Sequence, residues 1–199
     1  MAISFEVVAG GAHVLTGETG SGKTAILEMI GLARAPALGG LQLFGQDVAR
    51  VPRSARHTLR RRIGMIFQDL RLVDDLSADD NVGLAVQAAG RGGQSLATEI
   101  AEVMSWVGLG RRRQAMAGAL DDDGRGRLAL ARAVINRPDL IMADEPVGKT
   151  GQAILALLAD LNQAGTAILL ATRDGALAAN AGAEVTHLSR ARTAAGGRR

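Results

Sequence analysis

A glycine-rich segment near the N-terminus has the residue types and the spacing that can hold phosphate. The segment GETGSGKT fits the pattern G-x-x-x-x-G-K-[ST], which is typical of loops that bind the phosphates of a nucleotide. Its residues are Gly17, Glu18, Thr19, Gly20, Ser21, Gly22, Lys23 and Thr24. Glycine lets such a loop turn its N–H groups toward phosphate oxygens. We expect Lys23 to reach the β- and γ-phosphates and the Thr24 hydroxyl to bind Mg²⁺.

A second candidate site follows the apolar run LIMA, which ends in the carboxylates Asp144 and Glu145. In open α/β sheets, ligands bind outside the carboxyl ends of the strands. We interpret Asp144 as holding Mg²⁺ through its water shell and Glu145 as polarising an attacking water. A strand that ends in a solvated acidic turn is the simpler alternative, and the upstream phosphate-binding pattern favours the nucleotide site over it.

Short apolar runs alternate with helical patterns, which favours an α/β fold with a mostly parallel sheet. The runs predict strands at 12–16, 63–67, 140–144 and 166–172. The helical patterns predict helices at 23–30, 96–107, 128–136 and 152–163. Ser95 is the expected N-cap of the second helix. We expect one domain over residues 1–199, with an inserted helical lobe at about 77–136 and a disordered basic tail at about 190–199.

The composition excludes several classes of protein. Cysteine is absent from the chain of 199 residues, which excludes a disulfide scaffold, cysteine metal sites and a thiol nucleophile. The net charge is +3, and no concentrated basic face is apparent, so no nucleic-acid partner is expected. Arginines cluster between Arg50 and Arg62, where a solvated edge is the first interpretation and a lipid-facing patch the second. No signal peptide or membrane span is recognisable, so we expect a cytoplasmic chain.

Two further segments carry a resemblance to a known family. The segment FQDLRL, at 67–72, resembles a glutamine loop in which Gln68 contacts Mg²⁺. The segment RLALARA, at 127–133, resembles the helix that follows the signature motif of ATP-binding cassette (ABC) proteins. Together with the phosphate loop and the acidic strand end, these motifs make nearly the whole chain similar to an ABC ATP-binding subunit. The segment 59–72 most resembles cell-division subunits of the FtsE type.

This resemblance implies a P-loop NTPase fold of the ABC type that binds ATP and Mg²⁺, with Thr24, Gln68 and Asp144 at the metal and Glu145 as the catalytic residue. It also implies a homodimer that closes on two ATP molecules. An integral-membrane partner of the FtsX type would hold the dimer at the inner face of the plasma membrane and couple it to septal cell-wall remodelling. Three alternatives remain: the ATPase of another ABC transporter, a scaffold that binds nucleotide without hydrolysis, and a soluble P-loop kinase, which RLALARA disfavours.

The chain departs from the family pattern at positions that serve hydrolysis. The signature L-S-G-G-x is replaced by Leu120, Asp121, Asp122, Asp123 and Gly124. The acids are expected to repel the γ-phosphate of an opposite subunit, because two unit charges at ~4 Å cost about 4 kcal/mol at an effective dielectric of 20. The alternative is that Asp121 caps a helix and its neighbours favour the helix dipole, and both interpretations can hold at once. Arg173 replaces the switch histidine, and the segment 148–151 lacks the D-loop aspartate. We therefore expect ATP binding with weak hydrolysis.

The adenine side of the site also departs from the family. Family members usually carry an upstream strand with an aromatic residue that stacks on adenine, whereas this chain has no tyrosine. Phe5 falls where a later strand belongs. The sequence leaves two alternatives open: adenine stacking is lost, or the gene start has been placed too late.

Overall fold

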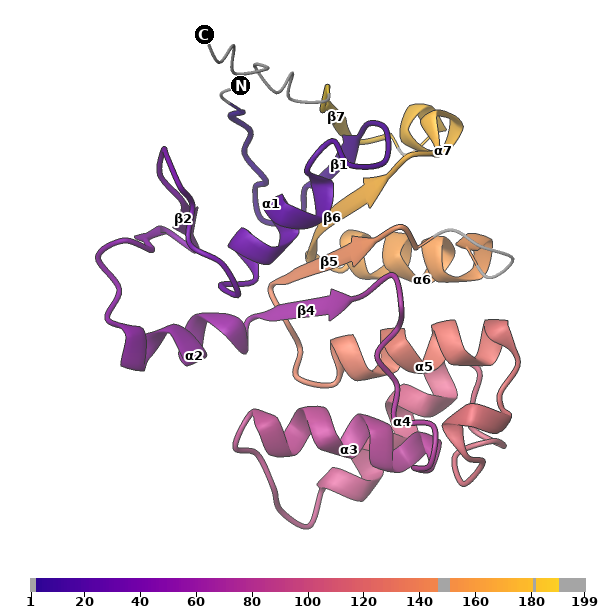
Figure 1. Cartoon of the computed structure of the whole chain (residues 1–199). Coiled ribbons are helices and arrows are strands. Elements are labelled where there is room, and N and C mark those ends of the chain that lie inside the picture. Colours follow the sequence, from indigo (N-terminus) through magenta and orange to yellow (C-terminus); the bar gives the residue numbers. More distant parts are fainter. Residues whose placement is uncertain (1–2, 147–150, 181, 190–199) are drawn as a thin grey trace, which may run out of the picture.

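A five-stranded parallel sheet forms the centre of the fold, with strand order β4–β5–β6–β1–β7 (Figure 1). The computed structural model describes residues 3–146, 151–180 and 182–189. The strands are β1 Ala12–Thr16, β4 Ile63–Ile66, β5 Leu140–Asp144, β6 Ala167–Thr172 and β7 Glu184–His187. The first four confirm the predicted strands to within a residue at each end. The sequence analysis missed β7 and a small hairpin, β2 Gln42–Leu43 and β3 Gln46–Asp47.

Seven α-helices lie within the described ranges. They are α1 Lys23–Ile30, α2 Arg56–Arg60, α3 Ala78–Ala88, α4 Leu96–Trp106, α5 Asp122–Val134, α6 Gly151–Gln163 and α7 Gly175–Asn180. The predicted limits of the third helix, 128–136, are wrong, because α5 begins six residues earlier and ends at Val134. Ser95 occupies the predicted N-cap position of α4. Its hydroxyl makes no cap hydrogen bond and donates instead to the Glu99 carboxylate at 3.0 Å.

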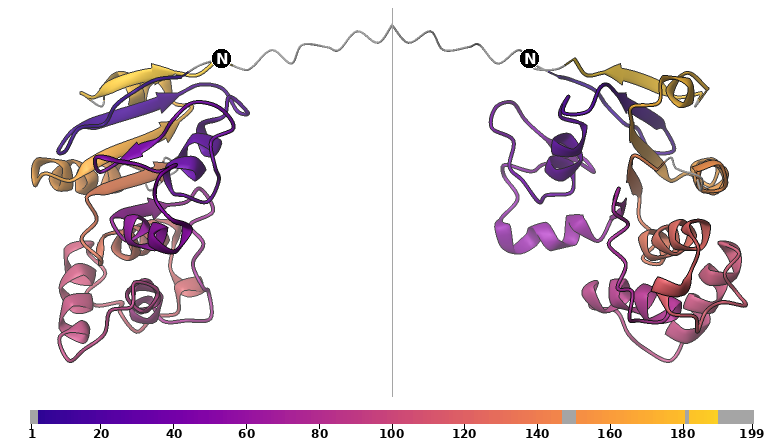
Figure 2. Two further views of the ribbon diagram at one scale, coloured as in Figure 1. Left: turned by 90° about the vertical axis from the view of Figure 1, so that its left-hand side faces the viewer. Right: turned by 45° about the vertical axis from the view of Figure 1, so that its right-hand side comes forward.

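Helices cover both faces of the sheet, which explains the continuous apolar runs in its central strands. Every residue of β5 and β6 is buried. On one face, α1 and α2 enclose a cluster that includes Leu27, Leu59 and Met142. On the other face, α5 and α6 enclose a larger cluster, and Figure 2 shows the two sets of helices on opposite sides of the sheet. Burying each large apolar side chain contributes about 1.5–3 kcal/mol, so these clusters hold the helices on the sheet.

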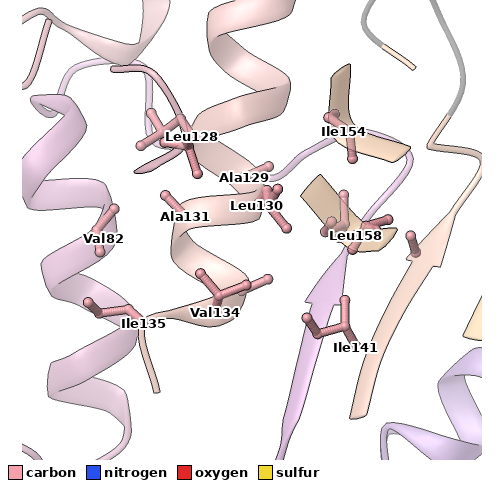
Figure 3. Close-up of a cluster of buried hydrophobic side chains, with 14 of the residues drawn as sticks. Val82, Leu128, Ala129, Leu130, Ala131, Val134, Ile135, Ile141, Ile154 and Leu158 are labelled. Atoms are coloured by element: carbon pink, nitrogen blue, oxygen red, sulfur yellow. The ribbon is translucent and has the colours of Figure 1, made fainter. Parts of the chain in front are cut away.

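Helix α5 lies between helix α3 and the sheet. Its side chains Leu128 and Leu130 are fully buried. In Figure 3, the side chains of α5 lie between Val82 of α3 and Ile141 of β5, with Ile154 and Leu158 of α6 alongside. In Figure 1, α3, α4 and α5 gather together below the sheet. This position makes α5 the main packing link between α3 and the strands that position the candidate site.

The register of the strands aligns their carboxyl ends. Thr16 of β1 pairs with Thr172 of β6, and Asp144 of β5 pairs with Ala171 of β6. The loop after β4 leaves the same edge of the sheet, because Ile66 pairs with Ala143. Segments that lie far apart in the sequence therefore meet at one edge.

The arginines of α2 and its approach serve local structure. Arg56 donates hydrogen bonds to the carbonyls of Val51 and Val48, and Arg60 donates to the carbonyl of Leu32. Arg62 forms an ion pair with Asp139 at 2.6 Å. Three of the clustered arginines are therefore engaged by partners within the chain. Separately, within the ranges described, no helix has the length and apolar character needed to cross a bilayer.

Candidate functional site

The phosphate-loop segment connects β1 to α1, as the sequence predicts. Gly17 and Gly22 have φ values of 150° and 101°, in the region that favours glycine. A Cβ at Gly17 would lie 2.3 Å from the carbonyl oxygen of Leu188, so only glycine fits at this close approach. Lys23, the first residue of α1, is buried, and its Nζ donates to the carbonyl oxygens of Gly17 and Glu18 at 2.6 and 3.1 Å.

Thr24 and Asp144 are in direct contact although they belong to different elements. The Thr24 hydroxyl donates to Oδ2 of Asp144 at 2.8 Å. Asp144 is only 4% exposed, and its Oδ1 is buried without a hydrogen-bond partner. An orphaned carboxylate oxygen beside a hydroxyl is a donor set that suits Mg²⁺, which prefers oxygen ligands and is usually held by one or two carboxylates together with substrate phosphates. These residues therefore fit the expected metal.

Burial controls the ionisation of Asp144. Desolvation raises the pKa of its carboxyl above the ordinary value, and the neighbouring charges of Glu145 and Glu28 raise it further. The hydrogen bond from Thr24 and the charge of Lys23 act in the opposite direction. A nearby cation would favour the charged form of this carboxyl.

Glu145 is held by backbone and side-chain donors at the end of β6. Its Oε1 lies 3.6 Å from Nζ of Lys23. Its Oε2 accepts hydrogen bonds from the Thr172 hydroxyl at 3.3 Å and from the backbone N–H of Arg173 at 3.1 Å. The left-handed backbone of Glu145, with φ of 47°, places the residue in a strained conformation. The sequence analysis missed Thr172 as a partner of Glu145, and a backbone donor such as that of Arg173 leaves no sequence signal.

Gln68 shares a cavity with the metal candidates. The cavity has a volume of about 690 Å³, and Thr24, Gln68 and Asp144 all line it. Gln68 itself is exposed, and it follows β4 at the same sheet edge. The structure thus brings the phosphate loop, Gln68 and the two carboxylates together. Within the described ranges no group of three or more His, Cys, Asp or Glu side chains could hold a metal alone, so a metal would depend on ligand phosphates.

The three acids of the altered signature lie at the start of α5, where most of their charge is paired. Asp121 is the N-cap: its carboxylate accepts from the Gly124 backbone N–H at 3.2 Å and pairs with Arg112 at 3.1 Å. These contacts lower the pKa of Asp121, the backbone hydrogen bond being the largest cause. Asp123 pairs with Arg127 at 2.5 Å.

The capping alternative for these acids therefore agrees with the structure. Of the three, within the described ranges, only Asp122 is left with an unpaired charge that could repel a γ-phosphate. Asp122 is exposed and has no ion pair with any residue that the structure describes. None of the contacts of Asp121 or Asp123 in the described ranges reaches the phosphate loop.

The remaining departures fall at positions with different surroundings. The side chain of Arg173 is exposed, and only its backbone N–H contacts Glu145. Residues 147–150 lie outside the described residues, so the D-loop expectation for 148–151 falls largely outside them, as does the expected tail from 190.

Phe5 stacks on His13 of β1, with the ring centroids 4.9 Å apart. Phe5 is thus engaged inside this chain.

Comparison with known proteins agrees with this geometry. A protein family described as ABC transporter matches residues 1–148. The chain belongs to the ABC transporter family. It is 34% identical over 176 residues to the cell division ATP-binding protein FtsE of Escherichia coli strain K12, covering 86% of this chain and 79% of FtsE.

Two other relatives have nearly the same identity. The lipoprotein-releasing system ATP-binding protein LolD of Shewanella sp. strain MR-7 is 33% identical over 190 residues, covering 92% of this chain and 82% of LolD. The macrolide export ATP-binding/permease protein MacB of Psychrobacter cryohalolentis is 34% identical over 184 residues, covering 90% of this chain but 28% of MacB. FtsE is therefore one of several relatives of similar identity within the family.

Solved structures confirm the fold expected from the sequence. A dimeric bacterial ABC transporter cassette superposes with a TM-score of 0.82 at 28% identity, covering 92% of this chain and 83% of that one. A dimeric post-hydrolysis state of an ATP-binding cassette, bound to ADP and Pi, gives 0.83 at 28% identity, covering 94% of this chain and 84% of that one. The fold of this chain is that of an ABC ATPase cassette, with a mostly parallel sheet core and helices.

Proposed function

We propose that this chain binds Mg-ATP as the nucleotide-binding subunit of a membrane-attached ABC complex. The observation that carries the proposal is the meeting of Lys23, Thr24, Asp144 and Glu145 at one edge of the sheet. In this proposal Lys23 binds the β- and γ-phosphates, while Thr24, Gln68 and Asp144 hold the metal. When bound, Mg²⁺ would neutralise negative charge on the phosphates. Glu145, held at Thr172 and Arg173, orients the attacking water.

Within the family we propose an FtsE-like role. A homodimer would associate with an integral-membrane partner of the FtsX type at the inner face of the plasma membrane and couple ATP binding to septal cell-wall remodelling. The support is the similarity to FtsE together with the segment FQDLRL at 67–72. Because LolD and MacB are equally similar, the ATPase of another ABC transporter is the second candidate.

We further propose that hydrolysis is weak. The support is the start of α5, where the backbone N–H of Gly124 is already engaged by the carboxylate of Asp121. Asp122 adds an exposed negative charge where the family presents glycine. If turnover is absent altogether, the chain acts as a nucleotide-binding scaffold rather than as an ATPase.

The binding site is tested by titrating ATP in the presence of Mg²⁺ into the wild-type protein and into Lys23→Ala. We expect the substitution to weaken binding by about 10–100-fold, because charged hydrogen bonds contribute about 1.5–3 kcal/mol each. Circular dichroism of both proteins controls for folding. Equal ATP affinity in the two proteins would refute the site.

The partner is tested by co-expression with candidate membrane subunits and affinity purification from detergent. Retention by an FtsX-like protein, but not by permease subunits of the lipoprotein-releasing or macrolide-export type, is the expected result. Retention by one of the latter would replace the FtsE-like role with the second candidate and leave the ATP site untouched.

A further inference from the structure

A strained turn follows Gln68 in the chain. Leu70 and Arg71 both have left-handed backbone conformations, with φ values of 58° and 48°. Neither is glycine, so this conformation is unfavourable for both of them. The turn is closed by hydrogen bonds from the N–H of Leu70 to the Phe67 carbonyl at 2.9 Å and from the N–H of Arg71 to the Asp69 carbonyl at 2.7 Å. Such a turn persists only where its surroundings hold it in place.

Arg132, in the last turn of α5, contacts both strained residues. Its Nη1 donates to the carbonyl oxygen of Arg71 and its Nη2 donates to that of Leu70. Burial lowers the pKa of this guanidinium, with a smaller contribution from the charge of Arg71. Within the described ranges Arg132 forms no ion pair, although the charge of Asp69 acts on it, and its hydrogen bonds go to the two carbonyls.

The end of α5 is itself fixed against the strand that leads into the turn. A Cβ on Gly64 of β4 would lie 2.5 Å from the carbonyl oxygen of Ala133, so strand and helix backbones are in direct contact there. The buried side chains of α5 hold the rest of the helix between α3 and the sheet (Figure 3). Arg132 therefore projects from a rigid support.

We propose that Arg132 is a positioning residue that holds Gln68 beside Thr24 and Asp144. The turn at Leu70 and Arg71 begins two residues after Gln68, which shares its cavity with those two side chains. The inference rests on the proposed function, because its consequence is that Arg132 sets the Mg²⁺-dependent part of the ATP affinity. Lysine cannot replace the arginine, because an ammonium lacks the planar fork that meets two carbonyls at once.

The first test uses the nucleotide-free protein. Hydrogen exchange is measured at the amides of residues 68–72 in the wild type, in Arg132→Lys and in the control Arg125→Lys. Arg125 also lies on α5 but binds Asp74 and the carbonyl of Ala117 instead. We expect about tenfold faster exchange at 68–72 in Arg132→Lys, as the loss of a charged hydrogen bond implies, and no change there in the control. Exchange at the wild-type rate in Arg132→Lys would overturn the proposal.

The second test compares ATP affinity with and without Mg²⁺. We expect Mg²⁺ to strengthen ATP binding in the wild type and in Arg125→Lys. Gln68→Ala, Arg132→Lys and the double variant should all lose this strengthening, and to the same extent. A full effect of Mg²⁺ in Arg132→Lys, together with its loss in Gln68→Ala, would overturn the proposal. A wild-type protein that binds no ATP would overturn the proposed function instead, and the nucleotide-free exchange data would then decide the role of Arg132 in the turn.

Discussion

At the scale of single residues, the sequence predicts which side chains form the candidate site but not which groups hold Glu145 in place. The identities of Lys23, Thr24, Asp144 and Glu145 follow from two sequence motifs, and the structure brings all four together. The support of Glu145 could not be predicted in the same way. Its donors include the backbone of Arg173, which depends on the register between β5 and β6 rather than on a residue type.

The buried charge of Asp144 leads to a prediction about stability and pH. The pKa of Asp144 is raised in the folded state, so the folded protein retains a proton on this carboxyl that the unfolded chain would release. The free energy of unfolding therefore falls as the pH rises from the ordinary pKa to the raised one. Asp144→Asn removes this loss of stability with rising pH, and the amide oxygen still accepts the hydrogen bond from Thr24. We expect a higher Tm at pH 7 but little difference below pH 4, measured by thermal unfolding without nucleotide.

The same substitution should abolish the strengthening of ATP binding by Mg²⁺, because an amide is a poor ligand for that ion. Titration of ATP into Asp144→Asn, with and without Mg²⁺, measures this loss. An unchanged Tm at pH 7 would show that the charge of Lys23 already compensates the carboxylate of Asp144.

Glu145 gives a prediction about turnover. If the altered signature already limits hydrolysis, removing the carboxylate of Glu145 should slow ATP hydrolysis only slightly further. We expect Glu145→Gln to change the steady-state ATPase rate by less than about twofold, whereas losing an acid–base group in an efficient enzyme costs about 10²–10⁴-fold. The measurement is phosphate release under saturating Mg-ATP. Ordinary cassette turnover in the wild type that Glu145→Gln abolishes would show that the signature acids matter less than proposed.

At the scale of elements, apolar periodicity predicted the limits of the buried strands and helices. It failed for elements that contain glycine or mostly exposed residues. The strands β1 and β5 and the helix α1 have the predicted limits, because apolar runs define them. Helix α5 begins earlier than predicted because Gly124 and Gly126 read as helix breakers, yet both are buried within the helix. Strand β7 is mostly exposed, so it has no apolar run to reveal it.

The start of α5 provides a prediction about assembly. Replacing Asp121, Asp122 and Asp123 by Ser, Gly and Gly restores the family signature and keeps an N-cap hydroxyl. We expect this variant to dimerise more strongly than the wild type in the presence of Mg-ATP and without the membrane partner, measured by analytical ultracentrifugation. Asp122→Asn, which removes only the unpaired charge, is the matched control. If the control dimerises as well as the triple variant, charge alone blocks the interface and backbone approach does not.

At the scale of the whole molecule, the phosphate loop depends on the far end of the chain. The backbone N–H of Leu188 donates to the Thr16 carbonyl at 2.7 Å, and the side chain of Leu188 is buried. The carbonyl of the same residue lies against Gly17. A local motif in the sequence is thus completed by residues that follow β7.

This dependence predicts the effect of truncation. A chain that ends at residue 183 loses β7 and Leu188, and we expect it to lose ATP affinity and at least about 2 kcal/mol of stability, by analogy with other losses of buried leucine. A chain that ends at Ser189 retains both and should match the full chain. Urea unfolding and ATP titration of the two truncated proteins provide the measurements. Equal behaviour of the two would contradict the proposed support of the loop.

The central place of β1, between β6 and β7, has a consequence for biosynthesis. The strand that enters the phosphate loop is synthesised well before both of its neighbours in the sheet, β6 and β7. At about 5–20 residues per second, the roughly 150 intervening residues take about 8–30 seconds to translate. During that interval β1 has no strand to pair with, and its apolar side chains are open to chaperones. Nascent chains of this protein should therefore acquire their nucleotide-binding shape only after β6 and β7 have been synthesised.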